Sequence, residues 1–469
     1  MRVRKPSWML VVAFATLTAA ACSAADGLAV EPIQVEVLSG ALEAPTPSPT
    51  TTTAPTTTTS ISPTTTTQPH NPDCVNRLPE PTVESPDKDA LATKIATALE
   101  HPALAEHDVT LSVWVDGWGE VITHNPRLAL QPASNQKLLV AIAANETLDI
   151  DKPLTTDIEL VGDDLVVRAG ADPTLRFNHL TEAISRALFT TGPSIDRLVI
   201  DVSQYPQATE PDGWRPWYVP QFVGPLSGFM VENNRWTGGE EIISDPVATN
   251  LARLVELLPE DVRVGSTQVT AGDNAPPPGV VLATVESAPV GSLVETMLVA
   301  SDNQNADLLL MELGREAVGT GNFESGAFAI DSVLASLCAP IDGMIDDGSG
   351  LSRENYRSAG AFVDTLSAIH GTPEGELLRS QLPVGGVSGT LAGRFGGAYA
   401  GRVQAKTGTL RTSRALTGWA EMSSGRDAIF SIIVNSKPTQ VETADPNSAP
   451  AMGPALGAID ALVREILDS

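Results

Sequence analysis

Basic residues are scarce in this chain of 469 residues, which has 29 Lys and Arg against 57 Asp and Glu and a formal net charge of −28. Because proteins that bind nucleic acid usually present a basic surface, this composition argues against a nucleic-acid partner. Histidine is also rare, and the six histidines lack the spacing of zinc ligands and any His-Glu-x-x-His motif. No metal or organic cofactor is implied. We interpret these histidines as surface or packing side chains: His70, His101, His107, His124, His179 and His370.

The N-terminus lacks a long hydrophobic run, because its apolar stretch from Trp8 to Ala21 is shorter than the roughly 20 residues of a membrane-spanning helix. Basic residues precede this stretch and small residues end it, which predicts an export signal over residues 1–22. Cys22 then resembles a bacterial lipoprotein site, although no large aliphatic residue stands three positions before it. The protein is therefore expected in the cell envelope, either secreted or anchored to the membrane through a lipid on Cys22.

Cysteine is limited to Cys22, Cys74 and Cys338. Export places these residues in an oxidising compartment, and if Cys22 is lipidated or removed, a disulfide between Cys74 and Cys338 is the remaining pairing. Residues 23–86 are predicted to be a linker, because residues 44–70 are almost all Thr, Pro and Ser and cannot form a core. An extended linker of this length would reach on the order of 150 Å, either as a tether or as a passive spacer.

Three short motifs follow one another in the chain: Ser134-Asn-Gln-Lys137, Ser301-Asp-Asn303 and Lys406-Thr-Gly408. Each is weak alone, because the second could cap a helix and the third could end a strand. Ser85-Pro-Asp-Lys88 has the spacing of the first motif but is interpreted as a helix N-cap followed by proline. Ser134 instead precedes an apolar run and would lie on the first turn of a core helix. The complete ordered set is typical of serine enzymes that acylate on a serine beside a lysine.

The spacing of Ser134 and Lys137 suits a nucleophile and its base. Residues three positions apart share one face of a helix, which brings the lysine amine within hydrogen-bond distance of the serine hydroxyl. Lys137 must be uncharged to accept a proton, and both burial and a second cation lower the pKa of a lysine. Lys406 is our candidate for that second cation. Backbone N–H groups at the helix N-terminus would favour an oxyanion hole.

A basic stretch surrounds the third motif. Between residues 394 and 414 there are five basic residues and no acidic one. We expect this stretch to attract an anionic substrate, since it lies in an otherwise acidic chain. Its members are Arg394, Arg402, Lys406, Arg411 and Arg414.

From about residue 88 onward the chain resembles the D-alanyl-D-alanine carboxypeptidase/endopeptidase family of class C low-molecular-mass penicillin-binding proteins. The resemblance is carried by the three motifs and by the following segments: Asp172-Pro-Thr-Leu175, Gly224-Pro-Leu-Ser227, Glu232-Asn-Asn234, Asp347-Gly-Ser-Gly-Leu-Ser352 and Ser388-Gly-Thr-Leu391. Two positions depart from the family pattern. Asp307 stands where the family usually has glutamate, and Arg411-Thr-Ser-Arg414 replaces a smaller, more neutral stretch. Both departures concern the substrate preference rather than the catalysis.

This resemblance implies catalytic roles for Ser134, Lys137, Ser301 and Asn303. Ser134 would attack the carbonyl of a D-Ala-D-Ala peptide bond while Lys137 takes its proton. Ser301 would relay a proton to the leaving amine, and Asn303 would hold Lys137 and the acyl-side amide. Water would then hydrolyse the acyl-enzyme.

The resemblance also implies a substrate site on the third motif. Its residues are Lys406, Thr407, Gly408 and Thr409. The lysine and the two threonines would bind the terminal carboxylate, and the backbone N–H groups of Ser134 and Thr409 would form the oxyanion hole. The expected partners are peptidoglycan stem peptides and β-lactam antibiotics.

The implied fold class is α+β, the serine penicillin-recognising (DD-peptidase/β-lactamase-like) fold, with an antiparallel sheet flanked by helices. Because nearly 400 residues exceed one usual core, we predict a peptidase domain in two parts, 87–155 and 286–469, with an accessory domain inserted at 156–285. Sequence periodicity predicts a β-hairpin over 110–123, strands at 165–168, 197–202 and 428–435, and helices at 88–100 and 456–467.

Two alternatives stay open. A β-lactamase or esterase on the same fold would need an efficient deacylating base, which the sequence does not identify. A non-catalytic scaffold that binds the cell wall would not need the intact motif residues. Ser388 lacks the Gly-x-Ser-x-Gly pattern of another class of serine hydrolases. The sequence does not distinguish carboxypeptidase from endopeptidase action. It also specifies neither the residue at the third position of the stem peptide nor the oligomeric state.

Overall fold

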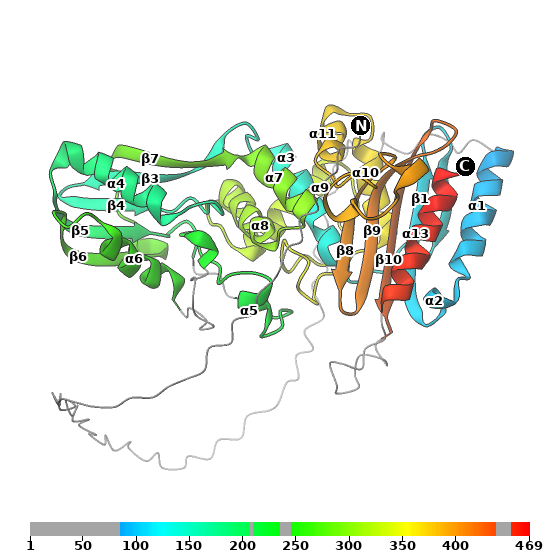
Figure 1. Ribbon diagram of the computed structural model, residues 1–469, viewed down its shortest axis with the longest axis horizontal. Helices are drawn as coiled ribbons and strands as arrows, with labels where there is room; N and C mark the ends of the chain where they lie inside the picture. Colours follow the sequence, from blue (N-terminus) through cyan, green and yellow to red (C-terminus); the bar gives the residue numbers. More distant parts are fainter. Residues whose placement is uncertain (1–84, 207–209, 235–244, 438–451) are drawn as a thin grey trace, which may run out of the picture. The chain divides into compact units, whose positions relative to one another are not determined.

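The computed structural model describes residues 85–206, 210–234, 245–437 and 452–469, which Figure 1 shows as helices and strands. The predicted export signal and nearly all of the predicted linker lie outside the described residues, as do Cys22 and Cys74. Cys338 forms a disulfide, and its predicted pairing with Cys74 stays a prediction. In the described part of the chain, no helix is both long and apolar enough to cross a membrane.

The first sheet has five antiparallel strands in the order β2-β1-β10-β9-β8. They are β1 (His107–Val115), β2 (Gly119–His124), β8 (Val403–Leu410), β9 (Ser413–Glu421) and β10 (Asp427–Ser436). The predicted hairpin is confirmed as β1 and β2, and the predicted strand at 428–435 is confirmed as β10. Because β1 pairs with β10 along its whole length, segments from the two ends of the described chain form one sheet.

Both faces of this sheet are covered, so β10 is buried along nearly its whole length. Phe430 and Ile432 pack into the core on the side of α1 and α13, whereas Ile429 and Ile433 pack into the core on the other side. Successive side chains of a strand point to opposite faces, which explains why an almost unbroken apolar run is needed here. The helices of the first side are α1 (Pro86–Leu99) and α13 (Gly453–Leu467), seen side by side in Figure 1.

The other side of the first sheet is covered by six helices among the described residues. They are α3 (Lys137–Thr147), α7 (Val290–Ala300), α8 (Asn303–Val318), α9 (Phe323–Ser336), α10 (Ala359–Ile369) and α11 (Pro373–Ser380). All six contribute to one apolar core, into which Trp419 of β9 also packs. A short helix, α2 (Pro102–Ala105), precedes β1. The helices predicted at 88–100 and 456–467 are confirmed as α1 and α13.

The second sheet lies between α3 and α7 in the sequence and has the order β6-β5-β4-β3-β7. Its strands are β3 (Pro153–Val161), β4 (Asp164–Arg168), β5 (Ser194–Asp201), β6 (Arg263–Thr270) and β7 (Val280–Pro289). The strands β4, β5 and β6 are parallel, and β3 is antiparallel to both neighbours. The predicted strands at 165–168 and 197–202 correspond to β4 and β5. The predicted domain limits, 155/156 and 285/286, fall inside β3 and β7. The division into domains stays a prediction.

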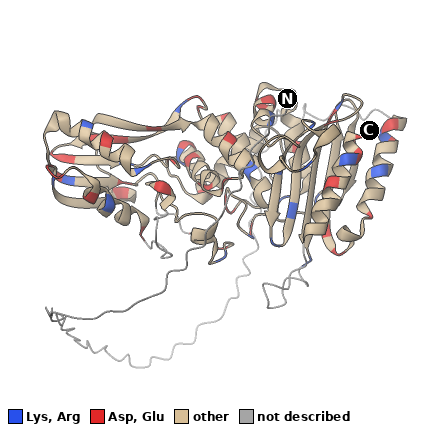
Figure 2. Cartoon of the chain, in the orientation of Figure 1, with Lys and Arg blue, Asp and Glu red and all other residues tan. Residues whose placement is uncertain are grey.

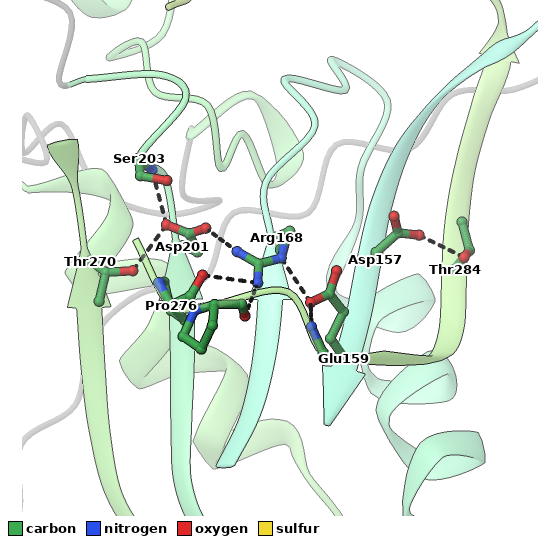
Figure 3. A network of polar contacts seen from close by, with 10 residues as sticks. Asp157, Glu159, Arg168, Asp201, Ser203, Thr270, Pro276 and Thr284 are labelled. Atoms are coloured by element: carbon green, nitrogen blue, oxygen red, sulfur yellow. Dashed lines mark hydrogen bonds and ion pairs between the residues drawn. The ribbon is translucent and has the colours of Figure 1, made fainter. Parts of the chain in front are cut away.

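One face of the second sheet is apolar and the other is polar. Helices α4 (Phe177–Thr191) and α6 (Pro246–Leu257) pack on the apolar face. The polar face carries Glu159, Arg168 and Asp201, and residues 271–279 cross it because they join β6 at one edge of the sheet to β7 at the other (Figure 3). Two further segments, α5 (Tyr218–Gln221) and the 3-10 turn η3 (Glu232–Asn234), lie between β5 and α6 in the sequence.

Candidate active site

The Ser134 motif lies where a 3-10 turn, η2 (Ala133–Gln136), leads into α3. Ser134 therefore precedes the α-helix that was predicted to carry it, and Lys137 is the first residue of that helix. In a 3-10 turn, side chains three residues apart lie one above the other. As a result, Nζ of Lys137 lies 3.2 Å from Oγ of Ser134.

Two glycines let other segments approach this turn closely. A Cβ atom on Gly350 would lie 2.0 Å from the carbonyl oxygen of Ala133, and Gly350 has a positive φ of 81°. A Cβ atom on Gly408 would lie 2.6 Å from the carbonyl oxygen of Pro132. Any side chain at either position would push the backbones apart. The loop around Gly350 and strand β8 therefore both contact the turn that carries Ser134.

Lys137 is fully buried, and oxygen atoms from three segments surround its amine. Nζ donates to Oγ of Ser134 and to Oδ1 of Asn303, the latter at 2.8 Å. It also donates a short hydrogen bond to the backbone carbonyl of Ser349. These contacts fix the position of the amine relative to the serine hydroxyl.

The pKa of Lys137 is lowered to about 8, chiefly because burial disfavours the charged ammonium. Negative charge on the nearby carboxyl groups would oppose this shift and raise the pKa, and these groups belong to Asp307, Asp347 and Asp302. The repulsion between the two amines adds to burial in lowering the pKa of Lys406, and the expected effect of Lys406 on the pKa of Lys137 stays a prediction. Burial thus brings Lys137 close to the pKa that a general base needs near neutral pH.

The second motif lies at the junction of α7 and α8. Ser301 ends α7 in the left-handed region with a φ of 58°, which is uncommon for a residue with a side chain. Asp302 caps α8 by accepting a hydrogen bond from the N–H of Asn305, so the capping interpretation of this motif is also correct. Asn303 is the first residue of α8, and its Nδ2 donates to the carbonyl of Phe222 at 3.0 Å.

The third motif lies in the middle of β8, not at a strand end. Lys406 is fully buried, and its Nζ donates to Oγ of Ser301 at 2.9 Å and to the carbonyl of Thr407 at 3.0 Å. Burial, and then the charge of Lys137, hold the pKa of Lys406 well below its usual range. Direct hydrogen bonds therefore link Ser134 to Lys137, Lys137 to Asn303, and Lys406 to Ser301. The structure brings these five predicted residues together.

Thr407 and Thr409 differ in their surroundings. The hydroxyl of Thr407 lies 2.9 Å from the hydroxyl of Thr390, which belongs to the 3-10 turn η5 (Gly389–Leu391), whereas Thr409 is exposed. A Cβ atom on Gly389 would lie 2.6 Å from the carbonyl oxygen of Val299 in α7. The turn η5 thus lies against both α7 and β8. The segment 388–391 contributed to the family resemblance, but Thr390 was not assigned to the site from the sequence.

The loop of residues 347–352, whose Ser349 carbonyl accepts from Lys137, was also not assigned to the site from the sequence. Its centre is Asp347, whose carboxylate accepts hydrogen bonds from the backbone N–H groups of Gly350 and Ser352, both at 2.7 Å. The side chains of Trp214 and Asn355 donate to the same carboxylate, each at 2.6 Å. The available signal was the segment 347–352, which matched the family without an assigned role.

Two members of the basic stretch, Arg394 and Arg402, bind groups away from Lys406, which corrects the sequence expectation for these two residues. Arg394 forms an ion pair with Asp460 of α13, and Arg402 donates to the carbonyl groups of Glu421 and Leu467. Arg414 donates to the backbone carbonyl at the end of β8. Lys and Arg positions are spread over both sheets and their helices in Figure 2. The attraction of anions by the remaining basic residues stays a prediction.

The comparisons with known proteins identify the family. The chain matches the D-Ala-D-Ala carboxypeptidase 3 (S13) family over residues 91–240 and 243–452. It belongs to that family. Carboxypeptidase DacB of Mycolicibacterium smegmatis is 28% identical over 420 residues, which cover 81% of this chain and 85% of that relative.

Solved structures agree on the fold of this S13 carboxypeptidase. Penicillin-binding protein 4 (dacB) of Haemophilus influenzae has a TM-score of 0.68 at 20% identity and covers 80% of this chain and 99% of its own. The same protein in complex with a β-lactam has a TM-score of 0.64 at 21% identity and covers 80% and 100%. The predicted family and the predicted α+β penicillin-recognising fold are confirmed. The chain is a serine-type D-alanyl-D-alanine carboxypeptidase of this family.

Proposed function

We propose that this S13 carboxypeptidase cleaves the D-Ala-D-Ala bond of peptidoglycan stem peptides through an acyl-enzyme on Ser134. The observation that carries the proposal is the buried amine of Lys137, which lies 3.2 Å from the serine hydroxyl and has a pKa of about 8. A fraction of Lys137 is therefore uncharged at neutral pH and available as a base. No second buried lysine is placed beside a serine at this spacing in the described residues, since Lys88 donates to the carbonyl of Trp118 instead.

The proposed acylation uses the contacts of the site in sequence. Lys137 takes the proton of Ser134 as the hydroxyl attacks the substrate carbonyl, and the negative oxygen is stabilised by the backbone N–H groups of Ser134 and Thr409. The proton taken from Ser134 then passes from Lys137 by way of Ser301, which accepts from Lys406, to the leaving amine of D-alanine, and this returns Lys137 to its uncharged form. Water then hydrolyses the ester, and Lys137 again serves as the base.

We assign the terminal carboxylate of the substrate to Lys406, Thr407 and Thr409, with Gly408 between the threonines, and we add Thr390. The hydroxyl of Thr390 lies beside that of Thr407, so the two can donate to the same anion. A bound carboxylate would also favour the charged form of Lys406, whose pKa is held low by burial and by the charge of Lys137. The carboxylate of a β-lactam would use the same donors.

We also propose that the protein acts outside the cytoplasm, as a secreted or lipid-anchored protein. The support is the predicted export signal over residues 1–22 and the cell-wall substrate of the proposed reaction. Endopeptidase action on crosslinked peptides is the finer alternative, because it uses the same acyl-enzyme and differs only in the leaving group.

Labelling by penicillin tests the proposed nucleophile. We expect one covalent penicillin adduct on the protein by intact-mass measurement, and we expect Ser134→Ala to abolish it because Ser134 is the hydroxyl beside the proposed base, Lys137. Ser85→Ala is the matched control, since Ser85-Pro-Asp-Lys88 has the same spacing at the start of α1. An adduct that survives on Ser134→Ala, or one that is lost on Ser85→Ala, would contradict the assignment.

Recognition of the carboxylate gives a second measurement. A hydrogen bond to a charged group contributes about 1.5 to 3 kcal/mol, so Lys406→Ala should lower kcat/KM for a D-Ala-D-Ala peptide by about one to two powers of ten. Thr390→Val should lower it by a smaller factor, and an amidated peptide should be a correspondingly poor substrate of the wild-type enzyme. Equal cleavage of the amidated and free peptides would rule out a carboxylate site and make an endopeptidase the better interpretation.

A further inference from the structure

Asp307 is a buried carboxyl group that none of the steps above uses. It lies in α8 one turn after Asn303, and its side chain has no exposed surface. Oδ1 of Asp307 accepts hydrogen bonds from the backbone N–H groups of Gly348 at 3.0 Å and Ser349 at 2.9 Å. Oδ2 is buried without a hydrogen-bond partner. Such a one-sided environment calls for an explanation, because buried polar atoms are usually paired.

Ser349 connects Asp307 to the base. The N–H of Ser349 is held by Asp307, and its carbonyl oxygen accepts the short hydrogen bond from Nζ of Lys137. Asn303 and Asp307 are four residues apart and therefore share one face of α8. Helix α8 thus holds the amine of Lys137 twice, directly through Asn303 and indirectly through the Ser349 peptide.

The charges around Lys137 suggest which form of Asp307 is present. The groups that face this amine are the carboxyls of Asp302, Asp307 and Asp347 and the amine of Lys406. Asp347 accepts hydrogen bonds on both oxygens, which stabilises its negative charge. Asp307 receives donors on one oxygen alone, and burial followed by the charge of Asp347 raises its pKa well above the usual range.

We propose that Asp307 is a positioning residue that, in its uncharged form, holds the Ser349 carbonyl against the amine of Lys137. The inference rests on the proposed role of Lys137 as the base. An uncharged Asp307 supplies a hydrogen-bond acceptor without adding a negative charge that would stabilise the ammonium of Lys137. The base is thereby fixed in place and still able to lose its proton near neutral pH.

Two substitutions with the same branched side-chain shape test this inference. Asp307→Asn keeps an acceptor for both N–H groups and places its amide nitrogen where no donor faces it, whereas Asp307→Leu removes the acceptor. The readout is the rate of penicillin acylation as a function of pH, followed by intact mass. We expect Asp307→Asn to keep the midpoint of the profile near that of the wild type. Asp307→Leu should acylate about tenfold more slowly or worse, because two buried N–H groups lose their acceptor.

A matched control is Thr156→Val in the second sheet. Thr156 is also fully buried, and its hydroxyl has no hydrogen-bond partner, so this change removes a buried polar group away from the site and should leave acylation unchanged. Thermal unfolding of each variant separates a loss of fold from a loss of positioning. If Asp307→Leu does not fold, the pH profile of Asp307→Asn still decides the charge state.

Two outcomes would overturn the inference. A charged Asp307 would raise the pKa of Lys137, so a lower midpoint in Asp307→Asn would show that the carboxylate is ionised. A folded Asp307→Leu variant that acylates at the wild-type rate would show that the Ser349 carbonyl needs no support. Either result would leave the proposed function intact, which fails instead if Ser134→Ala is still labelled.

Discussion

Replacing Lys137 by alanine is expected to slow acylation by penicillin by several powers of ten, because nucleophile and base act as a unit. In the wild-type enzyme the base is the uncharged amine, whose pKa is about 8. The rate of acylation should therefore rise as the pH increases towards about 8 and level off above it. Quenching the reaction after set times at each pH, followed by intact-mass measurement, gives both the rate and its pH dependence.

Two variants make this result specific. Lys137→Arg keeps a positive charge but cannot give up its proton at accessible pH, so it should be as slow as the alanine variant. Lys94→Ala removes an exposed lysine from α1, where Nζ donates to the hydroxyl of Ser469, and should acylate at the wild-type rate. Fast acylation of Lys137→Arg would show that Lys137 acts through its charge rather than as a base, and the proposed mechanism would have to be abandoned.

The site could be predicted from the sequence where its geometry is local or where the family resemblance supplied the missing contacts. The contact between Ser134 and Lys137 follows from a spacing of three residues. The contacts of Lys137 with Asn303 and of Lys406 with Ser301 join residues 166 and 105 positions apart. No periodicity in the sequence encodes such contacts, and the ordered motifs supplied them only through resemblance.

Backbone groups explain much of what was missed. The carbonyl of Ser349 binds Lys137 and the carbonyl of Phe222 binds Asn303, but every residue has a carbonyl, so residue identity carries no signal for this role. Thr390 reaches Thr407 because Gly389 lets the turn approach α7. That approach depends on the course of the loop, which a hydroxyl and a glycine in the sequence do not determine.

Arg394 and Arg402 were misjudged because neighbours in sequence were taken for neighbours in space. Arg394 binds the side chain of Asp460 in α13, and Arg402 binds the backbone carbonyl of Leu467 in the same helix. Both contacts lie on the far side of β8 from Ser301, which Lys406 contacts. For the second sheet, periodicity predicted β4 and β5 as strands. It could not predict that β5 pairs in parallel with both β4 and β6, because the pattern of a strand does not specify its partners.

Replacing Arg168 by methionine is expected to destabilise the protein by about 3–5 kcal/mol, because the change leaves two buried carboxylates without a cation. Nε of Arg168 pairs with Glu159 at 2.8 Å and Nη1 pairs with Asp201 at 2.7 Å, and both carboxylates are less than a tenth exposed. Nη2 also donates to the carbonyl groups of Pro276 and Pro277 in the segment that crosses the sheet, as Figure 3 shows.

Arg197→Met is the matched control for this prediction. Arg197 also pairs with an aspartate across two strands of the same sheet, Asp164, but its side chain is 44% exposed. Exposed ion pairs contribute about 0 to 1 kcal/mol, so this variant should unfold in urea close to the wild type. A loss of stability in Arg168→Met no larger than that in Arg197→Met would mean that the buried network is replaceable. The segment 271–279 would then have to be held by its own backbone rather than by the guanidinium of Arg168.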